Sequence, residues 1–340
     1  MINNKYKYLV GVQCFTYNQS KYILDALNGF VMQQTNFPFV VMVVDDASTD
    51  GEQDVIRKFV NEQFDITDTS IAYEKETDYA FITYAQHKTN KNCYISVLYL
   101  KENHYSQKKR KFPYLAEWRD NVKYEALCEG DDYWIDSLKL QKQVEFMEEN
   151  DEYGLVYGKA KSYIQVKNEF GGIIGENVSD FEELMLFNNI PTLTVLYRMA
   201  ARENYSSFVS EVSKSWLMGD YPLWLYIANN YKIHFIEDVF SVYRILEKSA
   251  SHSDSYEYNK QFITSTYNIR MFFCQKINNC EFVPIVENIK NQEIFNLAYD
   301  FNKYDEVINY YKLIKDKNIK KRIKYFISLF KNLTKHNYSE

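Results

Sequence analysis

Residues 39–51 read FVVMVVDDASTDG, and this stretch indicates how the first part of the chain folds. Six apolar residues, most of them valine, end abruptly at Asp45 and Asp46. A continuous apolar run of this length is typical of a strand covered on both faces, as in a parallel sheet with helices on each side. The sequence therefore predicts a buried strand over 39–44 with two carboxylates at its carboxyl end.

Alternating strand and helix patterns surround this stretch. Residues 8–15 (YLVGVQCF) are apolar and β-prone, residues 22–32 place apolar side chains at helical spacing, and a second helical pattern follows residue 51. The order strand, helix, strand, helix is typical of a parallel sheet with crossover helices. The sequence thus predicts an α/β fold.

Past residue 64 the alternation continues less regularly. Residues 65–92 are polar and rich in tyrosine, which predicts an excursion from the sheet. Strands are predicted over 94–100, 124–128, 153–163, 192–197 and 233–243, and helices over 115–124, 137–149 and 216–228. Because the chain is helix-like beyond about residue 255, we expect a domain over 1–255 and a helical region over 256–340.

Composition excludes several classes of protein. With 340 residues, 46% of them hydrophobic, the chain can bury a sizeable core, so disorder and disulfide scaffolds are excluded. The longest apolar run, residues 37–44, is far shorter than the roughly 20 residues of a membrane-spanning helix. The N-terminus has no secretion signal pattern, which predicts a cytoplasmic protein. Five scattered cysteines without a CxxC pair predict buried thiols rather than a zinc site.

Charge is divided unevenly along the chain. Residues 312–336 contain nine lysines and arginines and one aspartate, a formal charge of +8. Since the whole chain carries −6, the remainder carries −14. A nucleic-acid-binding surface needs Lys and Arg spread over its face, so an acidic body argues against nucleic acid as a partner.

A second acidic cluster follows the strand predicted over 124–128. It contains Glu129, Asp131 and Asp132, and it is expected at the same sheet edge as Asp45 and Asp46. Neighbouring carboxylates repel one another unless a cation or hydrogen-bond donors compensate, and hard oxygen ligands suit Mg²⁺ or Mn²⁺. The alternative is that both clusters are solvated turns and helix caps.

Four motifs stand in a particular order along the chain. They are FTYN at 15–18, VVDDASTDG at 43–51, CEGDDYW at 128–134 and GDYPLW at 219–224. Together they resemble the family-2 glycosyltransferases of the GT-A fold, especially bacterial enzymes that build surface polysaccharides. The resemblance covers about residues 5–255. It implies a nucleotide-diphospho-sugar transferase fold, a Rossmann-like central mixed sheet flanked by helices, with a helical C-terminal region outside the match.

The resemblance implies residues that bind the donor. Tyr17 matches the aromatic that stacks on the nucleotide base, and Asp46 the carboxylate that accepts from uracil N–H, which favours a UDP-sugar. Glu129 stands where the family usually has the first Asp of its metal motif, and its expected contact is with the ribose or through water. Alternatively, Tyr17 packs in its loop and Asp46 caps the following helix.

The resemblance also implies a metal site that binds the donor diphosphate. Asp131 and Asp132, with Asp132 favoured, match the carboxylates that hold Mg²⁺ or Mn²⁺ against the leaving nucleoside diphosphate. Arg244 is expected to pair with phosphate oxygens, and His252 to be an additional metal ligand. A lone histidine is, however, more often a surface or packing residue.

Asp220 matches the family's general base. Family-2 enzymes invert the anomeric configuration, so one base suffices to take the proton from the acceptor hydroxyl. The alternative for Asp220 is a helix N-cap, since Pro222 follows closely. The expected activity is a metal-dependent, inverting transfer of a sugar to a glycan or lipid-linked acceptor in surface polysaccharide assembly.

The basic tail has the pattern of an interfacial helix. Between residues 319 and 333 the apolar residues lie on one helical face with lysines around it, which suits peripheral contact with anionic lipid through Lys312 to His336, at the inner face of the cell membrane. A helix packed on the catalytic domain with a solvated basic rim fits the pattern equally well.

Two other functions remain open from the sequence. A nucleotidyltransferase can use a similar fold, but a Gly- and Lys-rich phosphate loop is missing from residues 15–20. A catalytically inactive glycan-binding or scaffold protein stays an alternative because Glu129 departs from the usual motif.

Overall fold

The computed structural model describes residues 6–178, 180–247 and 253–336. The chain forms two compact units. The first contains Met1–Asp180, Asn189–Glu203 and Tyr226–Ile245, and the second contains Phe181–Asn188, Asn204–Leu225 and Leu246–Glu340. The second unit thus takes in two segments that precede residue 255, and the domain division expected at that residue stays a prediction.

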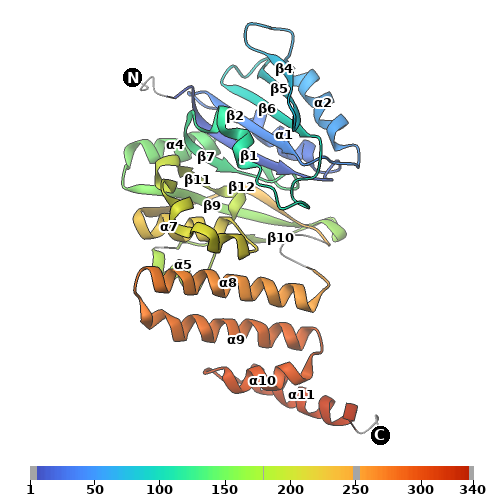
Figure 1. Cartoon of the computed structure of the whole chain (residues 1–340), viewed down its shortest axis with the longest axis vertical. Helices are drawn as coiled ribbons and strands as arrows, with labels where there is room; N and C mark the ends of the chain where they lie inside the picture. Colours follow the sequence, from blue (N-terminus) through green and yellow to red (C-terminus); the bar gives the residue numbers. More distant parts are fainter. Residues whose placement is uncertain (1–5, 179, 248–252, 337–340) are drawn as a thin grey trace. The chain divides into compact units, whose positions relative to one another are not determined.

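One mixed sheet runs through the first unit (Figure 1). Its strands are β1 (Tyr8–Thr16), β2 (Phe39–Asp45), β3 (Phe64–Asp65), β4 (Tyr73–Glu76), β5 (Ala80–His87), β6 (Cys93–Leu100), β7 (Val122–Leu127), β8 (Tyr133–Trp134), β9 (Tyr153–Ile164), β10 (Glu169–Ile174), β11 (Leu196–Arg198) and β12 (Lys232–Ile245). The strand order is β3-β5-β6-β2-β1-β7-β11-β9-β12-β8, with β4 paired to β5 and β10 to β9. The central strands β6, β2, β1 and β7 are parallel, so their carboxyl ends share one edge.

The α-helices divide between the two units. In the first unit they are α1 (Ile23–Val31), α2 (Glu52–Gln63), α3 (Ala116–Arg119) and α4 (Lys139–Glu149). In the second they are α5 (Phe181–Leu186), α6 (Tyr205–Val209), α8 (Tyr256–Lys276), α9 (Val283–Asp300), α10 (Tyr304–Leu313) and α11 (Ile319–His336), while α7 (Asp220–Asn230) has residues in both. The α/β class with a helical C-terminal region is therefore confirmed.

Two predicted segments differ from the structure. Residues 65–92 are no excursion, because β4 and β5 extend the sheet as antiparallel strands beside β6. The tyrosines that obscured the pattern are good strand formers, and β5 is buried along most of its length. The helix expected over 115–124 is only the single turn of α3, since Val122 already pairs with Tyr8 of β1.

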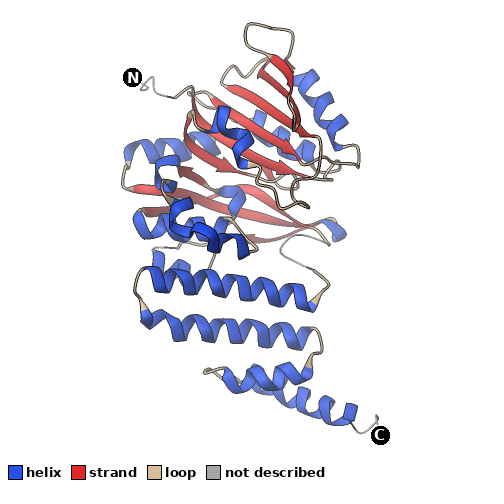
Figure 2. Ribbon diagram, viewed as in Figure 1, coloured by secondary structure: helices blue, strands red, loops and turns tan. Residues whose placement is uncertain are grey.

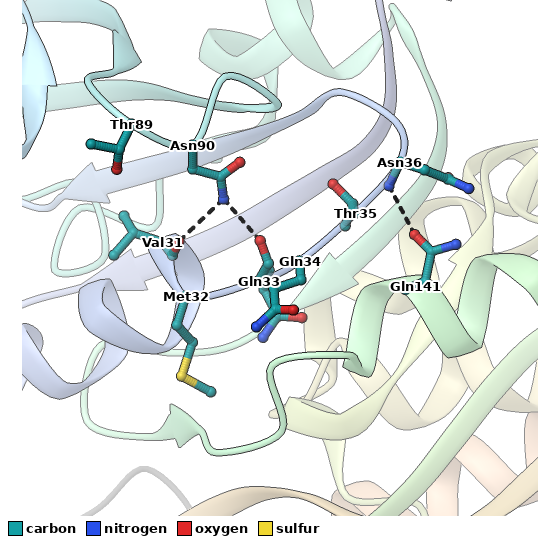
Figure 3. A pocket seen from close by; sticks show the side chains of 9 residues that line it. All are labelled: Val31, Met32, Gln33, Gln34, Thr35, Asn36, Thr89, Asn90 and Gln141. Carbon is teal, nitrogen blue, oxygen red and sulfur yellow. Dashed lines mark hydrogen bonds between the residues drawn. The ribbon is translucent and has the colours of Figure 1, made fainter.

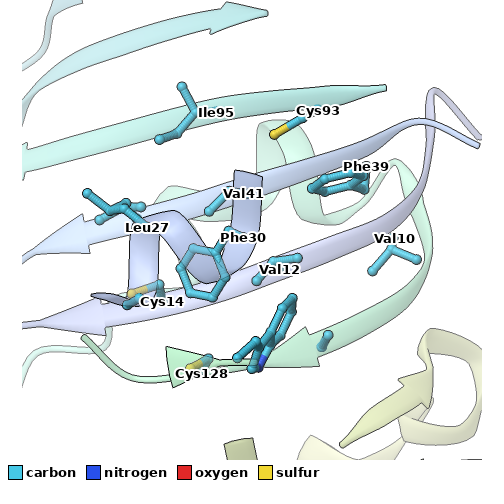
Figure 4. Packing of buried hydrophobic residues seen from close by; sticks show 14 of the residues in the cluster. Val10, Val12, Cys14, Leu27, Phe30, Phe39, Val41, Cys93, Ile95 and Cys128 are labelled. Atoms are coloured by element: carbon cyan, nitrogen blue, oxygen red, sulfur yellow. The ribbon is translucent and has the colours of Figure 1, made fainter. Parts of the chain in front are cut away.

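Helices cover the sheet where its strands are most apolar. Val10 and Val12 of β1, Val41 of β2 and Ile95 of β6 lie on the same face as Leu27 and Phe30 of α1, and all six are buried (Figure 4). Gly29 of α1 fits because a Cβ there would lie 2.9 Å from the backbone nitrogen and oxygen of Trp134. This close approach fixes the helix against the segment that carries Asp131 and Asp132.

The second unit is built from helices. In Figure 2, α8 and α9 lie side by side and antiparallel, and α9 packs in turn on α10. Tyr256, Phe295, Ala298, Val307 and Ile314 form a buried apolar cluster there. Among the described residues, no helix combines the length and the apolar character needed to cross a membrane.

Four of the five cysteines are buried, as expected from the sequence. They are Cys14, Cys93, Cys128 and Cys274. Cys280 is exposed, so the expectation of a buried thiol is wrong there. It begins a single 3₁₀ turn, Cys280–Phe282, that joins α8 to α9 and buries none of its residues.

A lysine is buried at the start of α4. The Nζ of Lys139 donates to Oε1 of Gln143 at 2.8 Å and lies 4.2 Å from the centre of the Trp134 ring. Burial lowers the pKa of Lys139 from its usual range to about 7. No carboxylate contacts this group directly among the described residues. The charged form of Lys139 therefore destabilises the folded state at every pH at which the side chain is protonated.

We expect Lys139→Met to stabilise the protein in a pH-dependent way. The unfolded chain keeps the usual lysine pKa of about 10.4, so between pH 7 and 10 it binds a proton that the folded state lacks, and the wild type gains stability as pH rises. The gain from Lys139→Met is accordingly largest near pH 6, roughly 2–4 kcal/mol, and shrinks toward pH 10. Urea unfolding followed by tryptophan fluorescence at pH 6, 8 and 10 measures it.

Lys142→Met on the same helix is the matched control. The hydrogen bonds that Lys142 donates to Asp136 and Asp238 raise the pKa of Lys142, so its removal brings no gain at low pH. A gain from Lys139→Met that stayed constant from pH 6 to 10 would show that the buried lysine does not lose its proton.

Candidate functional site

The candidate site lies at the carboxyl edge of the central parallel strands. Thr16 at the end of β1 pairs with Asp45 at the end of β2, and the amide of Asp46 donates to the carbonyl of Thr16 at 3.0 Å. Beyond β7, the amide of Gly130 donates to the carbonyl of Phe15 at 3.2 Å. The parallel register thus brings the two acidic motifs to the end of one strand.

Gly130 is required by the close packing of these loops. A Cβ at this position would lie 2.3 Å from Oγ1 of Thr16 and 2.5 Å from Oε1 of Gln19. Thr16 ends β1 and Gln19 lies in the loop after it, so any larger residue would push the 129–132 segment away from β1. The glycine therefore fixes the distance between the loop after β1 and the segment that carries Asp131 and Asp132.

Glu52 is a buried carboxylate that the sequence analysis missed. Its Oε2 accepts from the amide of Gln19 and from the hydroxyl of Ser48, each at 2.8 Å, and its Oε1 accepts from the hydroxyl of Thr16. Burial raises the pKa of Glu52. Glu52 joins the loops after β1 and β2, but an acid in the first turn of a helix is too ordinary a pattern to reveal this.

Asp131 and Asp132 form a close acidic pair. Burial is the main cause that raises the pKa of each, and the charge of Asp131 raises that of Asp132 further. Oδ1 of Asp132 accepts from the backbone amide of Arg244 at 2.7 Å, and the side chain of Gln19 donates to Asp131. A buried and a half-buried carboxyl that resist ionisation together favour a bound cation.

Glu52 and the acids of the 128–134 motif act on one thiol. After burial, the negative charges of Glu52, Glu129, Asp131 and Asp132 raise the pKa of Cys14 on β1. Their fields therefore overlap at the end of β1. In the part of the chain that the structure describes, no three His, Cys, Asp or Glu side chains are arranged as a metal-binding group. The carboxylate oxygens present fit Mg²⁺ or Mn²⁺, which is usually held by one or two carboxylates and completed by substrate phosphates.

Arg244 is close to the acidic pair but is already engaged. Its Nε donates to the carbonyl of Asp131 at 2.7 Å, Nη1 to Oε1 of Gln165 at 2.7 Å, and Nη2 to Asp25 at 2.6 Å. The guanidinium also lies 4.7 Å from the centre of the Tyr22 ring. In this arrangement Arg244 positions the backbone of Asp131 and Asp132, and binding a phosphate would require it to exchange Asp25.

Asp46 holds a loop rather than facing solvent. Its Oδ1 accepts from the amide of His104 at 2.7 Å, and its Oδ2 accepts from the amide of Tyr105 at 3.0 Å and from Nζ of Lys111 at 3.1 Å. The neighbouring Asp45 has a buried Oδ2 without a hydrogen-bond partner among the described residues. Neither carboxylate presents an exposed oxygen to a nucleotide base while the loop over 103–111 is in place.

The remaining predicted donor residues differ in exposure. Tyr17, with 45% of its surface exposed, lies in the loop between β1 and α1, where an aromatic ring is accessible for stacking. Glu129 is exposed, and its charge adds to the causes that raise the pKa of buried Asp132. His252, the predicted additional metal ligand, lies outside the described residues.

Asp220 belongs to the second unit. It is the first residue of α7, is half-buried, and its Oδ1 accepts from the amide of Tyr221 at 2.8 Å. Its charge adds to burial in raising the pKa of Tyr205. A carboxylate at a helix start is compatible with a cap and with a general base.

A separate hollow of about 560 Å³ lies at the opposite edge of the sheet. It is lined by residues before the start of β2 and of β6, including Gln34, Asn36 and Asn90, and by Gln141 of α4 (Figure 3). Asn90 donates to the carbonyls of Val31 and Gln33, and the amide of Asn36 donates to Gln141. These groups hold the loops at that edge together, and none of the lining residues is charged.

Comparison with known sequences points to one family. Residues 14–98 match the family described as Glycosyl transferase family 2. Uncharacterized proteins of Mycobacterium bovis and Mycobacterium tuberculosis are 26% identical over 197 residues, which cover 56% of this chain and 46% of theirs. The chain thus spans about half the length of the curated relatives it matches.

One solved structure shares the fold. The mannosyltransferase PcManGT of Pyrobaculum calidifontis, in complex with GDP-Man and Mn²⁺, superposes with a TM-score of 0.50 at 14% identity over 86% of this chain and 74% of that one. TarS of S. aureus gives a TM-score of 0.49 at 19% identity over 91% of this chain and 50% of that one. The family match over residues 14–98 and the mixed sheet support a family-2 glycosyltransferase, and the chain has the GT-A fold.

We expect Asp46→Asn to loosen the 103–111 loop. The asparagine side chain is neutral, so Lys111 loses its carboxylate partner. The side-chain NH₂ group also faces the backbone N–H of Tyr105, so two donors meet. Each unsatisfied buried group costs about 1–3 kcal/mol. Trypsin should therefore cleave after Lys108, Lys109 or Arg110 about tenfold faster, because cleavage follows the open population of the loop.

Asp54→Asn, an exposed change on α2, serves as the control for this experiment. Equal trypsin rates for wild type and Asp46→Asn would mean that the carboxylate does not hold the loop in solution.

Proposed function

We propose that the protein is a metal-dependent, inverting glycosyltransferase that moves a sugar from a nucleotide-diphosphate donor, a UDP-sugar, to a hydroxyl of an acceptor. The observation that carries this proposal is the pair Asp131 and Asp132 at the carboxyl end of β7, where Asp132 is buried, Asp131 is half-buried, and burial raises the pKa of both. Such a pair destabilises the fold unless a cation compensates it. Proteins retain destabilising groups of this kind at sites of function.

Asp131 and Asp132 would hold Mg²⁺ or Mn²⁺, and Gln19 and the backbone amide of Arg244 orient the two carboxylates. The chemistry that such an ion supplies is neutralisation of the charge on the leaving nucleoside diphosphate. The related fold of PcManGT was solved with GDP-Man and Mn²⁺, which supports this class of ligand.

Asp220 acts as the general base. Its carboxylate takes the proton from the acceptor hydroxyl as that oxygen bonds to the anomeric carbon, on the face opposite the diphosphate. In the structure one of its oxygens accepts from the amide of Tyr221, a contact that fixes the carboxylate at the start of α7.

Tyr17 stacks on the nucleotide base from the loop after β1. Asp46 accepts from uracil N–H after the 103–111 loop releases its carboxylate. Glu129 contacts the ribose from its exposed position. Arg244 reaches the diphosphate by exchanging its Asp25 partner for a phosphate oxygen.

The acceptor is a glycan or a lipid-linked glycan of surface polysaccharide assembly, handled in the cytoplasm at the inner face of the membrane. The resemblance to polysaccharide-building enzymes supports this class of acceptor. The order of motifs, the GT-A sheet and the acid at the start of α7 are all parts that a transferase of this kind requires.

A thermal-shift screen of UDP, GDP, CDP and TDP, each with and without Mn²⁺, tests the donor site. We expect UDP to raise Tm only when Mn²⁺ is present, because the carboxylates and the diphosphate repel one another without it. Asp132→Asn should abolish this metal-dependent shift. Asp78→Asn, an exposed acid in the turn between β4 and β5, should leave it unchanged.

A metal-dependent shift with GDP instead of UDP would retain the transferase and correct the donor. Absence of any shift with all four nucleotides would contradict the donor site and favour an inactive glycan-binding protein. Release of diphosphate on incubation with a nucleoside triphosphate and a sugar phosphate would instead indicate a nucleotidyltransferase.

Asp220→Asn tests the base. We expect transfer to fall by about 10²–10⁴-fold, the usual contribution of general base catalysis, while the dissociation constant for UDP with Mn²⁺ stays unchanged. Release of UDP in the presence of an acceptor measures transfer, and calorimetry measures binding. Asp300→Asn on α9 is the matched control in the same unit.

Loss of UDP binding in Asp220→Asn would place this residue in donor binding or in folding. Unchanged transfer would assign the base to another group.

A further inference from the structure

Helix α11 carries its apolar residues on the outside. Exposed fractions are 75% for Ile319, 53% for Ile323, 64% for Phe326 and 69% for Phe330. Steps of three and four residues separate these positions, so they form one continuous stripe along the helix. Ile327 beside them is 37% exposed. The stripe of Ile319, Ile323, Phe326, Ile327 and Phe330 is called the apolar face below.

The opposite side of α11 is polar and packed. Lys321 is 8% exposed and Ser328 is fully buried. The Nζ of Lys321 donates to Oε1 of Gln292 on α9 and to the carbonyl of Asp316, each at 2.9 Å. A helix packed in a globular unit normally turns its apolar side inward. The arrangement in α11 is the reverse.

Several contacts hold the helix in this orientation. The ring of Tyr325 stacks on Tyr311 of α10, with centroids 4.1 Å apart. Nδ2 of Asn332 donates to Asp305 at 2.7 Å, and Nζ of Lys324 to Asn296 at 3.1 Å. Rotating α11 to bury the apolar face would break all of these contacts. The outward face is therefore fixed by the packing of the polar side.

Cations border the apolar face. At 100° per residue, exposed Lys320 and Lys331 lie along one side of it and exposed Arg322 along the other. They belong to the segment 312–336, which carries a formal +8. An apolar stripe between two cationic borders is the pattern of a helix that lies in the plane of a membrane interface.

This charge decides between the possible occupants. A second copy of the chain would bring a second +8 segment against the first, and like charges would oppose the contact. A surface of anionic lipid offers acyl chains for the apolar face and negative headgroups for the lysines and arginine on its borders. An anionic lipid surface therefore matches both the apolar face of α11 and the cations on its borders.

We propose that α11 docks on the surface of an anionic lipid bilayer, with Ile319, Ile323, Phe326 and Phe330 inserted at the headgroup boundary. Docking on lipid requires neither donor nor metal, and so goes beyond sugar transfer. The further idea, that docking brings the protein to a lipid-linked acceptor, rests on the proposed function.

Flotation of the full chain with vesicles tests the proposal, without nucleotide or metal. Vesicles of phosphatidylcholine alone are compared with vesicles containing 30% phosphatidylglycerol. We expect at least tenfold stronger binding to the anionic vesicles, weakened as NaCl rises from 0.1 to 0.5 M. The double variant Phe326→Asn/Phe330→Asn should bind at least tenfold more weakly.

The charge variant Lys320→Gln/Arg322→Gln should lose about fivefold per cation, the usual effect of one basic residue near an anionic surface. Phe170→Asn in β10 and Lys58→Gln in α2 remove an exposed aromatic and an exposed lysine elsewhere, and should bind like the wild type. Because all substituted side chains are exposed, circular dichroism and Tm should not change.

Equal flotation with neutral, anionic and no vesicles would overturn the proposal. A second result would also overturn it: no vesicle binding, together with a dimer in analytical ultracentrifugation that is lost in the Phe326→Asn/Phe330→Asn variant. Because this assay uses no donor, its failure would leave the nucleotide screen and the proposed transfer reaction unaffected.

Discussion

The parallel pairing of β1 with β2 on one side and β7 on the other is the constraint on which the site depends. It sets Thr16 beside Asp45 and carries the chain after β7 alongside Phe15. Two acidic motifs about eighty residues apart in sequence therefore reach the same strand end. Neither motif alone could form the site, because each supplies carboxylates to one side of β1 only.

Placing so many acids at one edge has an electrostatic cost, and the fold meets it in two different ways. Asp46 and Glu52 are satisfied by the protein itself, through backbone amides, hydroxyls and Lys111. Asp131 and Asp132 receive fewer hydrogen-bond donors from the protein, and the charge of Asp131 adds to burial in raising the pKa of Asp132. The first group acts as structural support for the loops, whereas the second is left to be compensated by a ligand.

The second unit follows a different principle. Its apolar cluster joins α8, α9 and α10 through residues such as Phe295 and Val307. Helix α11 contributes polar and aromatic contacts to this group while its apolar face stays exposed. The same amphipathic pattern that usually buries a helix here produces an outward surface, because neighbouring polar groups on α9 and α10 select the other side.

The sequence by itself determined the α/β class, the strands around residues 8–15 and 39–44, and the location of the acids at strand ends, because apolar runs and turn residues are local signals. It also contained the motifs of the family. It could not reveal β5, whose tyrosine-rich pattern is ambiguous until it pairs with β6, nor the turn over 116–119, where β-pairing of Val122 overrides the helical pattern.

Only the tertiary structure decided how the acids are used. Glu52 and Asp46 are distinguishable from Asp132 by their partners, and those partners come from distant segments that no local pattern connects. Likewise, Arg244 finds Asp25 more than two hundred residues away. The direction in which α11 turns its apolar face was equally undetermined, because amphipathicity defines two faces of a helix and only the packing chooses between them.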